Sequence, residues 1–187
     1  MKVTRLVALS VLFAVASAPA VDARPRPAGH TNFSKFEANK TFGLGLELGY
    51  PDGINGKYFL SSSNALDFGL GYAYRNYYAG DGLNLYVDYL WHPFVLATAD
   101  AFELPFYIGV GGHFWRFDWG CDRFGNCADY GEAFGVRVPI GIAFDFNEVP
   151  LDIFLQVVPT FDFFSHYNGH DPYLGFWGSV GIRFWFN

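Results

Sequence analysis

From residue 42 onward, segment after segment of the chain has a large apolar residue at nearly every second position. The pattern is clear in FGLGLELGY (residues 42–50), LDFGLGYAY (66–74) and FGVRVPIGIAFDF (134–146). Successive side chains of a β-strand point to opposite faces of its sheet, so this period predicts strands with one apolar face. No helical period separates the segments, and the sequence therefore predicts an all-β fold.

Eight such segments follow one another. They span residues 42–50, 57–60, 66–75, 83–92, 104–113, 134–145, 151–162 and 176–186. Links 61–64 and 147–150 are short, whereas 76–82, 118–132 and 165–172 are longer, polar and glycine-containing. Two links depart from this alternation, since 51–56 is short and 93–103 is long. Short turns at one end and long loops at the other are typical of antiparallel up-and-down transmembrane barrels.

The face opposite the apolar residues is rich in glycine and in charged residues. An eight-stranded barrel has an interior only just wide enough for ordinary side chains, so the bulky face does not fit inside it. The composition agrees, because 51% of residues are hydrophobic and 16% are charged, against about 25% charged in soluble domains. We therefore expect an eight-stranded antiparallel transmembrane β-barrel whose apolar face meets lipid. The aromatic residues expected at its two lipid interfaces are Tyr50, Tyr72, Tyr74, Trp91, Phe144, Phe146, Phe161 and Phe184.

The inward face predicts a network of charges in the lumen. Its expected members are Glu47, Lys57, Asp67, Arg75, Asp88, Arg137, Asp145 and Arg183, with Asp152 and Asp162 on the same face. His92 and His113 also project inward by the alternation. Two interpretations stay open at this point: a paired network that plugs the barrel, or a gated ion path.

The amino terminus has the three parts of a secretory signal. Lys2 and Arg5 precede an apolar run over residues 6–16, and small residues follow. The expected organisation is a signal peptide (1–23), a flexible periplasmic leader (24–41) and the barrel (42–187), placed in the outer membrane of a Gram-negative-type bacterium. The formal net charge of −6 argues against a nucleic-acid partner, which needs a basic face.

The two cysteines, Cys121 and Cys127, lie close together in the polar stretch CDRFGNC. In an exported protein this spacing predicts one disulfide that closes a short loop. A metal site would need further ligands close by.

The last strand, VGIRFWFN (residues 180–187), resembles the carboxy-terminal signature that outer-membrane barrels present to their assembly machinery. GLGLELGYPDGINGKYFLS, NLYVDYLWHP, PFYIGVGGHF and GVRVPIGIAFDF together resemble an uncharacterised family of small outer-membrane barrels, akin in architecture to the OmpA and OmpX barrels. The resemblance covers roughly residues 43–186. It implies fold and placement, together with outer-membrane lipid and the barrel-assembly machinery as partners, but no activity.

Two segments contain residue types that could carry chemistry. FSHYNG (164–169) is similar to the His-x-Ser-Asn stretch of lipid A deacylases, but Asn168 stands at the nucleophile position, and Ser165 and His166 are strand neighbours that point apart. HYNGHD (166–171) offers only His166, His170 and Asp171 as ligands, an incomplete metal site. We therefore expect no enzyme activity, cofactor or metal.

The expected role is structural or surface-interacting, with loops 118–132 and 165–172 as the contact surface for an extracellular ligand or host molecule. Candidate surface-binding residues are Trp119, Phe124, Tyr130 and Tyr173, with Trp115 as a further loop aromatic. The alternatives are a narrow transport pore and, third, a lipid A-modifying enzyme.

Overall fold

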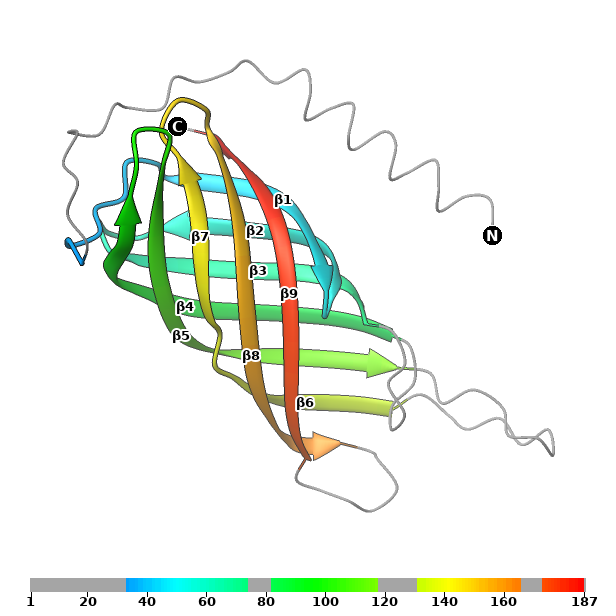
Figure 1. Cartoon of the computed structure of the whole chain (residues 1–187). Coiled ribbons are helices and arrows are strands. Elements are labelled where there is room, and N and C mark those ends of the chain that lie inside the picture. Colours follow the sequence, from blue (N-terminus) through cyan, green and yellow to red (C-terminus); the bar gives the residue numbers. More distant parts are fainter. Residues whose placement is uncertain (1–32, 74–81, 118–130, 166–172, 187) are drawn as a thin grey trace, which may run out of the picture.

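The computed structural model describes residues 33–73, 82–117, 131–165 and 173–186, and nearly all of them belong to β-strands (Figure 1). The strands are β1 (Phe42–Gly49), β2 (Asp52–Phe59), β3 (Asn64–Ala73), β4 (Gly82–Thr98), β5 (Phe102–Phe117), β6 (Gly131–Arg137), β7 (Ile140–Phe146), β8 (Leu151–Ser165) and β9 (Tyr173–Phe186). Among these described residues, no helix is long and apolar enough to cross a membrane.

The strands form one antiparallel sheet that closes on itself. Neighbouring strands along the chain pair with each other, except for β6 and β7, and β9 returns to pair with β1 from Phe42↔Phe186 to Gly49↔Ser179. We call this closed sheet the ring. Phe42 and Phe186 lie at its terminal end, with the turns 60–63, 99–101 and 147–150, while the strand ends next to 74–81, 118–130 and 166–172 form its loop end. The up-and-down antiparallel order predicted from the sequence is confirmed.

β6 and β7 together occupy one place in the ring, so nine strands fill eight places. Both pair with β5 on one side and β8 on the other. The sequence predicts a single strand over 134–145, and the structure interrupts it at Val138–Pro139, because proline cannot donate to the ladder. The break is bridged from both sides: Gly109 N–H donates to the Pro139 carbonyl, and Val138 N–H donates to the Pro159 carbonyl.

Two predicted links are strand in the structure. Residues 93–98 continue β4, and only 99–101 turn, so the long link predicted at 93–103 is wrong. The register of β4 against β5 shifts between Trp91 and Phe94 and again between Val95 and Ala97. Such irregularities place additional residues in one strand, so the two-residue period is interrupted in the sequence there. Likewise β2 begins at Asp52, five residues before the predicted start at Lys57, because Gly53 and Gly56 obscure the alternation.

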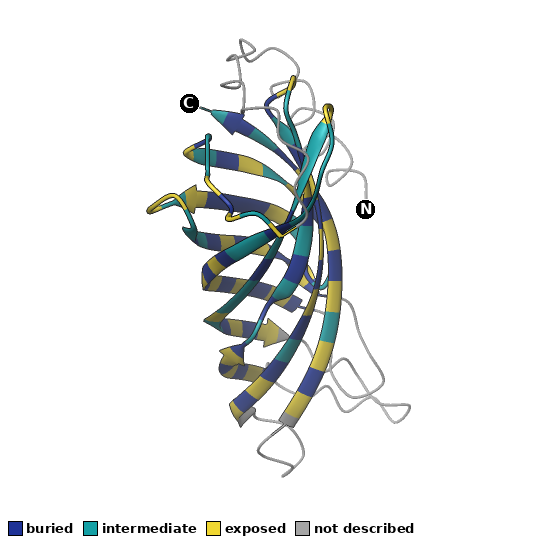
Figure 2. Cartoon of the chain, turned by 60° about the vertical axis from the view of Figure 1, so that its left-hand side comes forward, coloured by how far each residue is buried: buried dark blue, intermediate teal, exposed yellow. Residues whose placement is uncertain are grey.

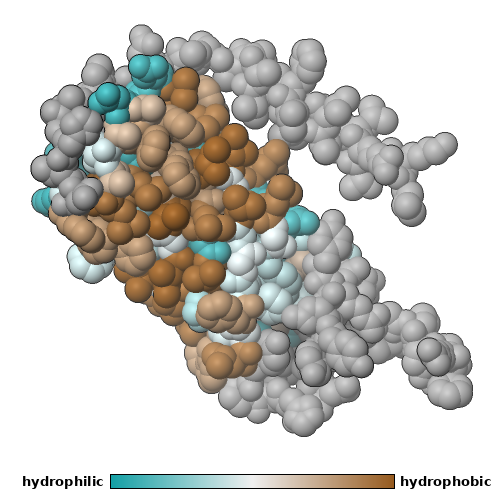
Figure 3. All heavy atoms as spheres, viewed as in Figure 1, coloured by the Kyte–Doolittle hydropathy of each residue, from teal (hydrophilic) through white to brown (hydrophobic). Residues whose placement is uncertain are grey.

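The two faces of the ring are opposite in character, and in Figure 2 exposed and buried residues alternate along the strands. The large hydrophobic residues on the outward face are exposed, and the charged residues on the inward face are buried. In Figure 3 hydrophobic residues cover much of the wall formed by β7, β8 and β9. The assignment of faces made from the period is confirmed for the described strands.

Residues 33–41 differ from the expected flexible leader. Ser34 forms a β-bridge with Val95, and Phe36 and Lys40 are buried, so this part of the segment packs against the terminal end of the ring. The sequence shows no period there because the segment is held by individual contacts and not by a ladder. The predicted signal peptide (1–23) and residues 24–32 lie outside the described residues.

Candidate functional site

The interior of the ring holds most of the charged residues predicted for it. Glu47, Lys57, Asp67, Asp88, Arg137, Asp145 and Arg183 are all buried there, as are Asp152 and Asp162. Arg75 lies outside the described residues. Since these groups cannot reach bulk water, each needs a partner inside.

Arg183 on β9 is the hub of one part of this interior. Its Nη1 donates to Asp67 Oδ1 (2.7 Å) and to Asn55 Oδ1 (3.2 Å), and its Nε donates to Asp152 Oδ1 (3.0 Å). The guanidinium also lies 4.2 Å from the centre of the Phe154 ring. The planar fork of arginine is suited to two carboxylates in different directions, and here it joins β9 to β2, β3 and β8.

Glu47 on β1 is the centre of a second part. Its Oε1 accepts from Ser179 Oγ (2.5 Å) and from Gln156 Nε2 (3.0 Å), and its Oε2 accepts from the Tyr86 hydroxyl. Asn55 Nδ2 donates to both the Tyr86 oxygen (2.7 Å) and Asp67 Oδ2 (3.1 Å). Tyr86 and Asn55 therefore connect the carboxylate of Glu47 to the Arg183 hub.

A third ion pair lies against Tyr86. Arg137 Nε is 3.0 Å from Asp88 Oδ2, and the Arg137 guanidinium lies 3.7 Å from the centre of the Tyr86 ring. Such close stacking of arginine on an aromatic face is favourable in a site that excludes water.

Both interior histidines are hydrogen-bonded, where the alternation predicts them. His113 Nε2 is 2.7 Å from Asp162 Oδ1. His92 Nδ1 is 3.1 Å from the Ser63 carbonyl, which can only accept, so this nitrogen carries the proton. His92 Nε2 is then an acceptor, and Lys57 Nζ donates to it at 2.8 Å.

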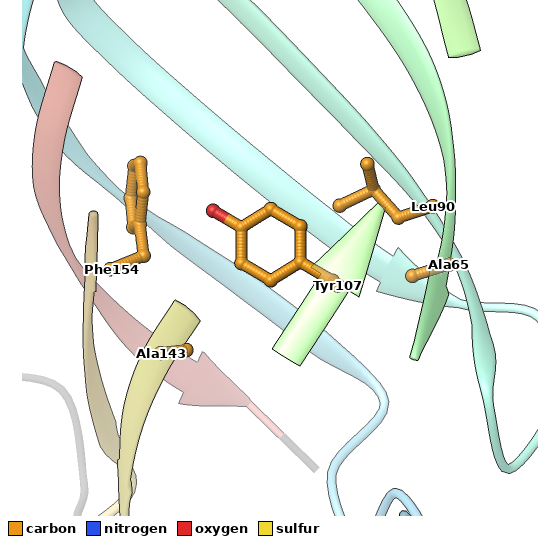
Figure 4. Packing of buried hydrophobic residues seen from close by; sticks show 5 residues of the cluster. All are labelled: Ala65, Leu90, Tyr107, Ala143 and Phe154. Atoms are coloured by element: carbon orange, nitrogen blue, oxygen red, sulfur yellow. The ribbon is translucent and has the colours of Figure 1, made fainter. Parts of the chain in front are cut away.

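Large aromatic rings also lie inside, at positions of inward parity. Tyr107, Phe154, Leu90, Ala65 and Ala143 form a buried cluster towards the terminal end, in which the Tyr107 ring points towards Phe154 and its hydroxyl donates to Gln156 Oε1 (3.2 Å) (Figure 4).

The interior glycines make room for these groups. A Cβ at Gly69 would lie 2.3 Å from the Tyr86 ring, and one at Gly181 would lie 2.3 Å from the Phe154 ring. Gly111 leaves the same space for the Asp88 carboxylate, which a Cβ would approach to 2.0 Å. The inner face is thus glycine-rich because large side chains from neighbouring strands lie flat against it.

Replacement of Gly69 by valine is expected to lower the free energy of unfolding by about 1–3 kcal/mol, because the Tyr86 ring must move and its bonds to Glu47 and Asn55 are lost. Gly178 is the matched control, since a Cβ added there would lie 3.7 Å from its nearest neighbouring atom. Thermal unfolding in detergent measures both. Equal midpoints for Gly69→Val and Gly178→Val would contradict this role for Gly69.

The loop end of the interior is lined by three aromatic rings. Tyr50 stacks on Trp177 (centroids 3.8 Å apart) and meets the edge of Trp115 (5.6 Å). Two expectations are corrected here: Tyr50 does not join an outer girdle, and Trp115 is buried on β5 and is not a loop anchor. Gly49 accounts for the inward position of the Tyr50 side chain. Its φ of 126° ends the alternation and turns the next residue over the opening.

Several predicted site residues have no described side chain. Cys121, Cys127, Trp119, Phe124, Tyr130, His166, Asn168, His170 and Asp171 lie outside the described residues. Ser165 and Tyr173 end β8 and begin β9, but their side chains are not described. Within the described ranges, no three His, Cys, Asp or Glu residues are arranged to hold a metal ion.

The network includes residues that the sequence analysis missed. Asn55, Tyr86, Gln156 and Ser179 share the inward parity of the charged residues, and this shared parity was the available signal. Lys40, which pairs with Asp145, precedes the first strand and has no such signal. The interior as a whole is a set of paired groups that join strands across the ring.

Comparisons with known proteins give one structural and one family relationship. The N-terminal β-barrel domain of Pseudomonas aeruginosa OprF is similar, at 14% identity and a TM-score of 0.47, over 84% of this chain and 100% of that one. No curated protein matches the sequence. Residues 33–185 match the family described as protein of unknown function (DUF3996), and the chain belongs to that family.

Proposed function

We propose that this protein is an outer-membrane β-barrel that anchors its loop end at the cell surface, in a structural or surface-interaction role. The observation that supports this most strongly is the outward face of the ring. It is a belt of exposed aliphatic and aromatic side chains around an interior of buried charges. A protein in water would have the opposite arrangement.

The charged residues on the outward face mark the edge of this belt. Among the described strands they are Asp52, Arg116 and Glu132, and each lies within two residues of a strand end at the loop end. Arg116 and Glu132 pair across β5 and β6, with Nε and Oε1 4.0 Å apart. The neighbouring outward residues, Phe114 and Phe134, are exposed and apolar. We infer that the hydrocarbon layer ends between these two rows.

The length of the belt fits a bilayer. On β9 the outward residues run from Leu174 to Phe186. Twelve residue steps of about 3.4 Å, tilted by about 45°, cover about 29 Å, close to the apolar band of roughly 25 Å in such barrels. Closure of β9 on β1 pairs the last strand with the first, so the ring has no open edge to leave unpaired in lipid.

The interior favours an anchor over a pore. Arg183 bonds to residues of β2, β3 and β8, and Glu47 bonds to residues of β4, β8 and β9. These bonds cross the space that a solute would use. A pore of the same ring would need several of them to break together.

In this role, outer-membrane lipid surrounds the wall, and the barrel-assembly machinery recognises β9. Segments 118–130 and 166–172, with candidate anchors Trp119, Phe124 and Tyr130, are the expected contact surface for an extracellular ligand or host molecule.

Cell fractionation and a heat-modifiability gel test the placement directly. The expected result is recovery in the outer-membrane fraction and a gel band that shifts on boiling, with reaction of a thiol reagent at Cys121 and Cys127 on intact cells after mild reduction. Recovery as a dissolved periplasmic protein without detergent would overturn the proposal.

Each of the two alternative functions predicts a different experimental result. A narrow pore would show discrete conductance steps in planar bilayers. A lipid A-modifying enzyme would change the mass of lipid A when the protein is expressed.

A further inference from the structure

Residues 33–41 cross the opening at the terminal end of the ring, where Figure 1 draws them in blue. Phe33 N–H donates to the Val95 carbonyl, and Val95 N–H donates to the Ser34 carbonyl. Ala38 N–H donates to the Ser62 carbonyl in the turn after β2. Val95 is on β4, three places from β1 around the ring. The segment therefore spans the opening and does not simply continue β1.

The aromatic residues of the segment lie on opposite sides of the rim. Phe33 is exposed on the outside, 5.7 Å from Phe94 between ring centroids. Phe36 is buried inside, 5.1 Å from His92 and 5.7 Å from Phe59. Phe36 thus covers the histidine that accepts the Lys57 hydrogen bond.

Lys40 holds the other side of the segment. Its Nζ pairs with the Asp145 carboxylate and donates to the Phe146 carbonyl at 3.0 Å, both on β7, and the Lys40 and Asp145 side chains are nearly inaccessible. Counted the other way round the ring, β7 is again three places from β1. The contacts of the segment are therefore at widely separated points of the rim.

We propose that residues 33–40 form a detachable stopper, seated in a binding site at the terminal end of the barrel. The site consists of the Asp145 carboxylate, an aromatic socket formed by Phe59 and His92, and the backbone of Ser62 and Val95. Its ligand class is a peptide segment with an aromatic residue four positions before a lysine, which this chain supplies itself as Phe36 and Lys40.

The stopper is able to leave because the ring does not depend on it. Every strand place of the ring has two antiparallel neighbours without these residues. Segments with few backbone bonds to the rest of a protein open locally, at a free energy below that of global unfolding. Undocking would uncover Asp145 and the Lys57–His92 pair to solvent at this end while the sheet stays closed.

Hydrogen exchange with mass spectrometry, on the full mature chain in detergent, tests this. The wild type should protect the amides of Phe33 and Ala38. Lys40→Ala and Phe36→Ala should each raise the exchange rate of these two amides by roughly tenfold or more. The first variant loses a hydrogen bond between charged groups, and the second loses a buried aromatic ring. The β-strands should keep their protection. Lys35→Ala is the matched control, since Lys35 is exposed on the same segment, and it should change the rate less than about twofold.

The swapped pair Lys40→Asp with Asp145→Lys should restore protection. Unprotected amides in the wild type, or Lys40→Ala behaving like Lys35→Ala, would overturn the stopper. So would loss of protection that spreads equally through β1–β9, since the segment would then be part of the folding core. If the swapped pair does not restore protection, the claim that the Lys40–Asp145 ion pair holds the stopper in place is overturned. Because docking is measured within one folded chain, these outcomes are independent of the proposed membrane placement.

Discussion

Arg183→Ala is expected to lower the free energy of unfolding by about 3–5 kcal/mol, because it leaves the buried carboxylates of Asp67 and Asp152 without their cation. The loss should appear as a lower temperature for the heat-induced gel shift in detergent. The free energy of unfolding of Arg183→Lys should lie between those of the wild type and Arg183→Ala. An ammonium group keeps the positive charge but cannot reproduce the fork that reaches both carboxylates.

Arg116→Ala is the matched control for this change. Its side chain is 53% exposed and its partner Glu132 is 4.0 Å away, so solvent screens the pair and its removal should change the free energy of unfolding by less than about 1 kcal/mol. If both arginine variants shift at the same temperature, the paired interior does not stabilise the barrel, and the ion-path interpretation regains support.

A second large effect is expected on the outward face. Leu155 is 53% exposed and lies midway along the apolar belt, where it pairs with Val180. If lipid surrounds it, Leu155→Arg should cost about 2–4 kcal/mol in unfolding from a bilayer and should reduce the amount assembled in the membrane. The same change on the surface of a protein in water would be nearly neutral.

Leu174→Arg provides the depth control, because Leu174 is 73% exposed but stands next to the loop end of β9. Near the interface the cost falls to about 0–1 kcal/mol. Denaturant unfolding in lipid vesicles measures both variants. A loss that is equal at the two positions, or absent at both, would argue against a transmembrane wall.

Much of the fold could be predicted from the local pattern. Leu44, Leu46 and Leu48 against Gly45 and Glu47 indicate which side of β1 is bulky, and the structure buries Glu47 and exposes the leucines. The pattern failed where glycine or proline interrupts it. Pro139 splits one predicted strand into β6 and β7, and Gly49 turns Tyr50 inward.

The candidate site was predictable only as a list of inward residues. The period assigns Asp67 and Arg183 to the interior, but they are 116 residues apart in the chain and meet only because β9 closes on β1. Lys40 and Asp145, 105 residues apart, meet because a segment without any period folds over the rim.

A two-residue period is a property of consecutive side chains, so the order of residues alone dictated the β class, the antiparallel succession and the opposite character of the two faces. The period does not determine how high along the axis of the closed sheet, or at which angle around that axis, each side chain lies. Those depend on the register of every strand pair and on the stagger with which the sheet closes. Only the tertiary structure therefore decided which buried charges pair, why glycines face aromatic rings, and that residues 33–41 cover one end.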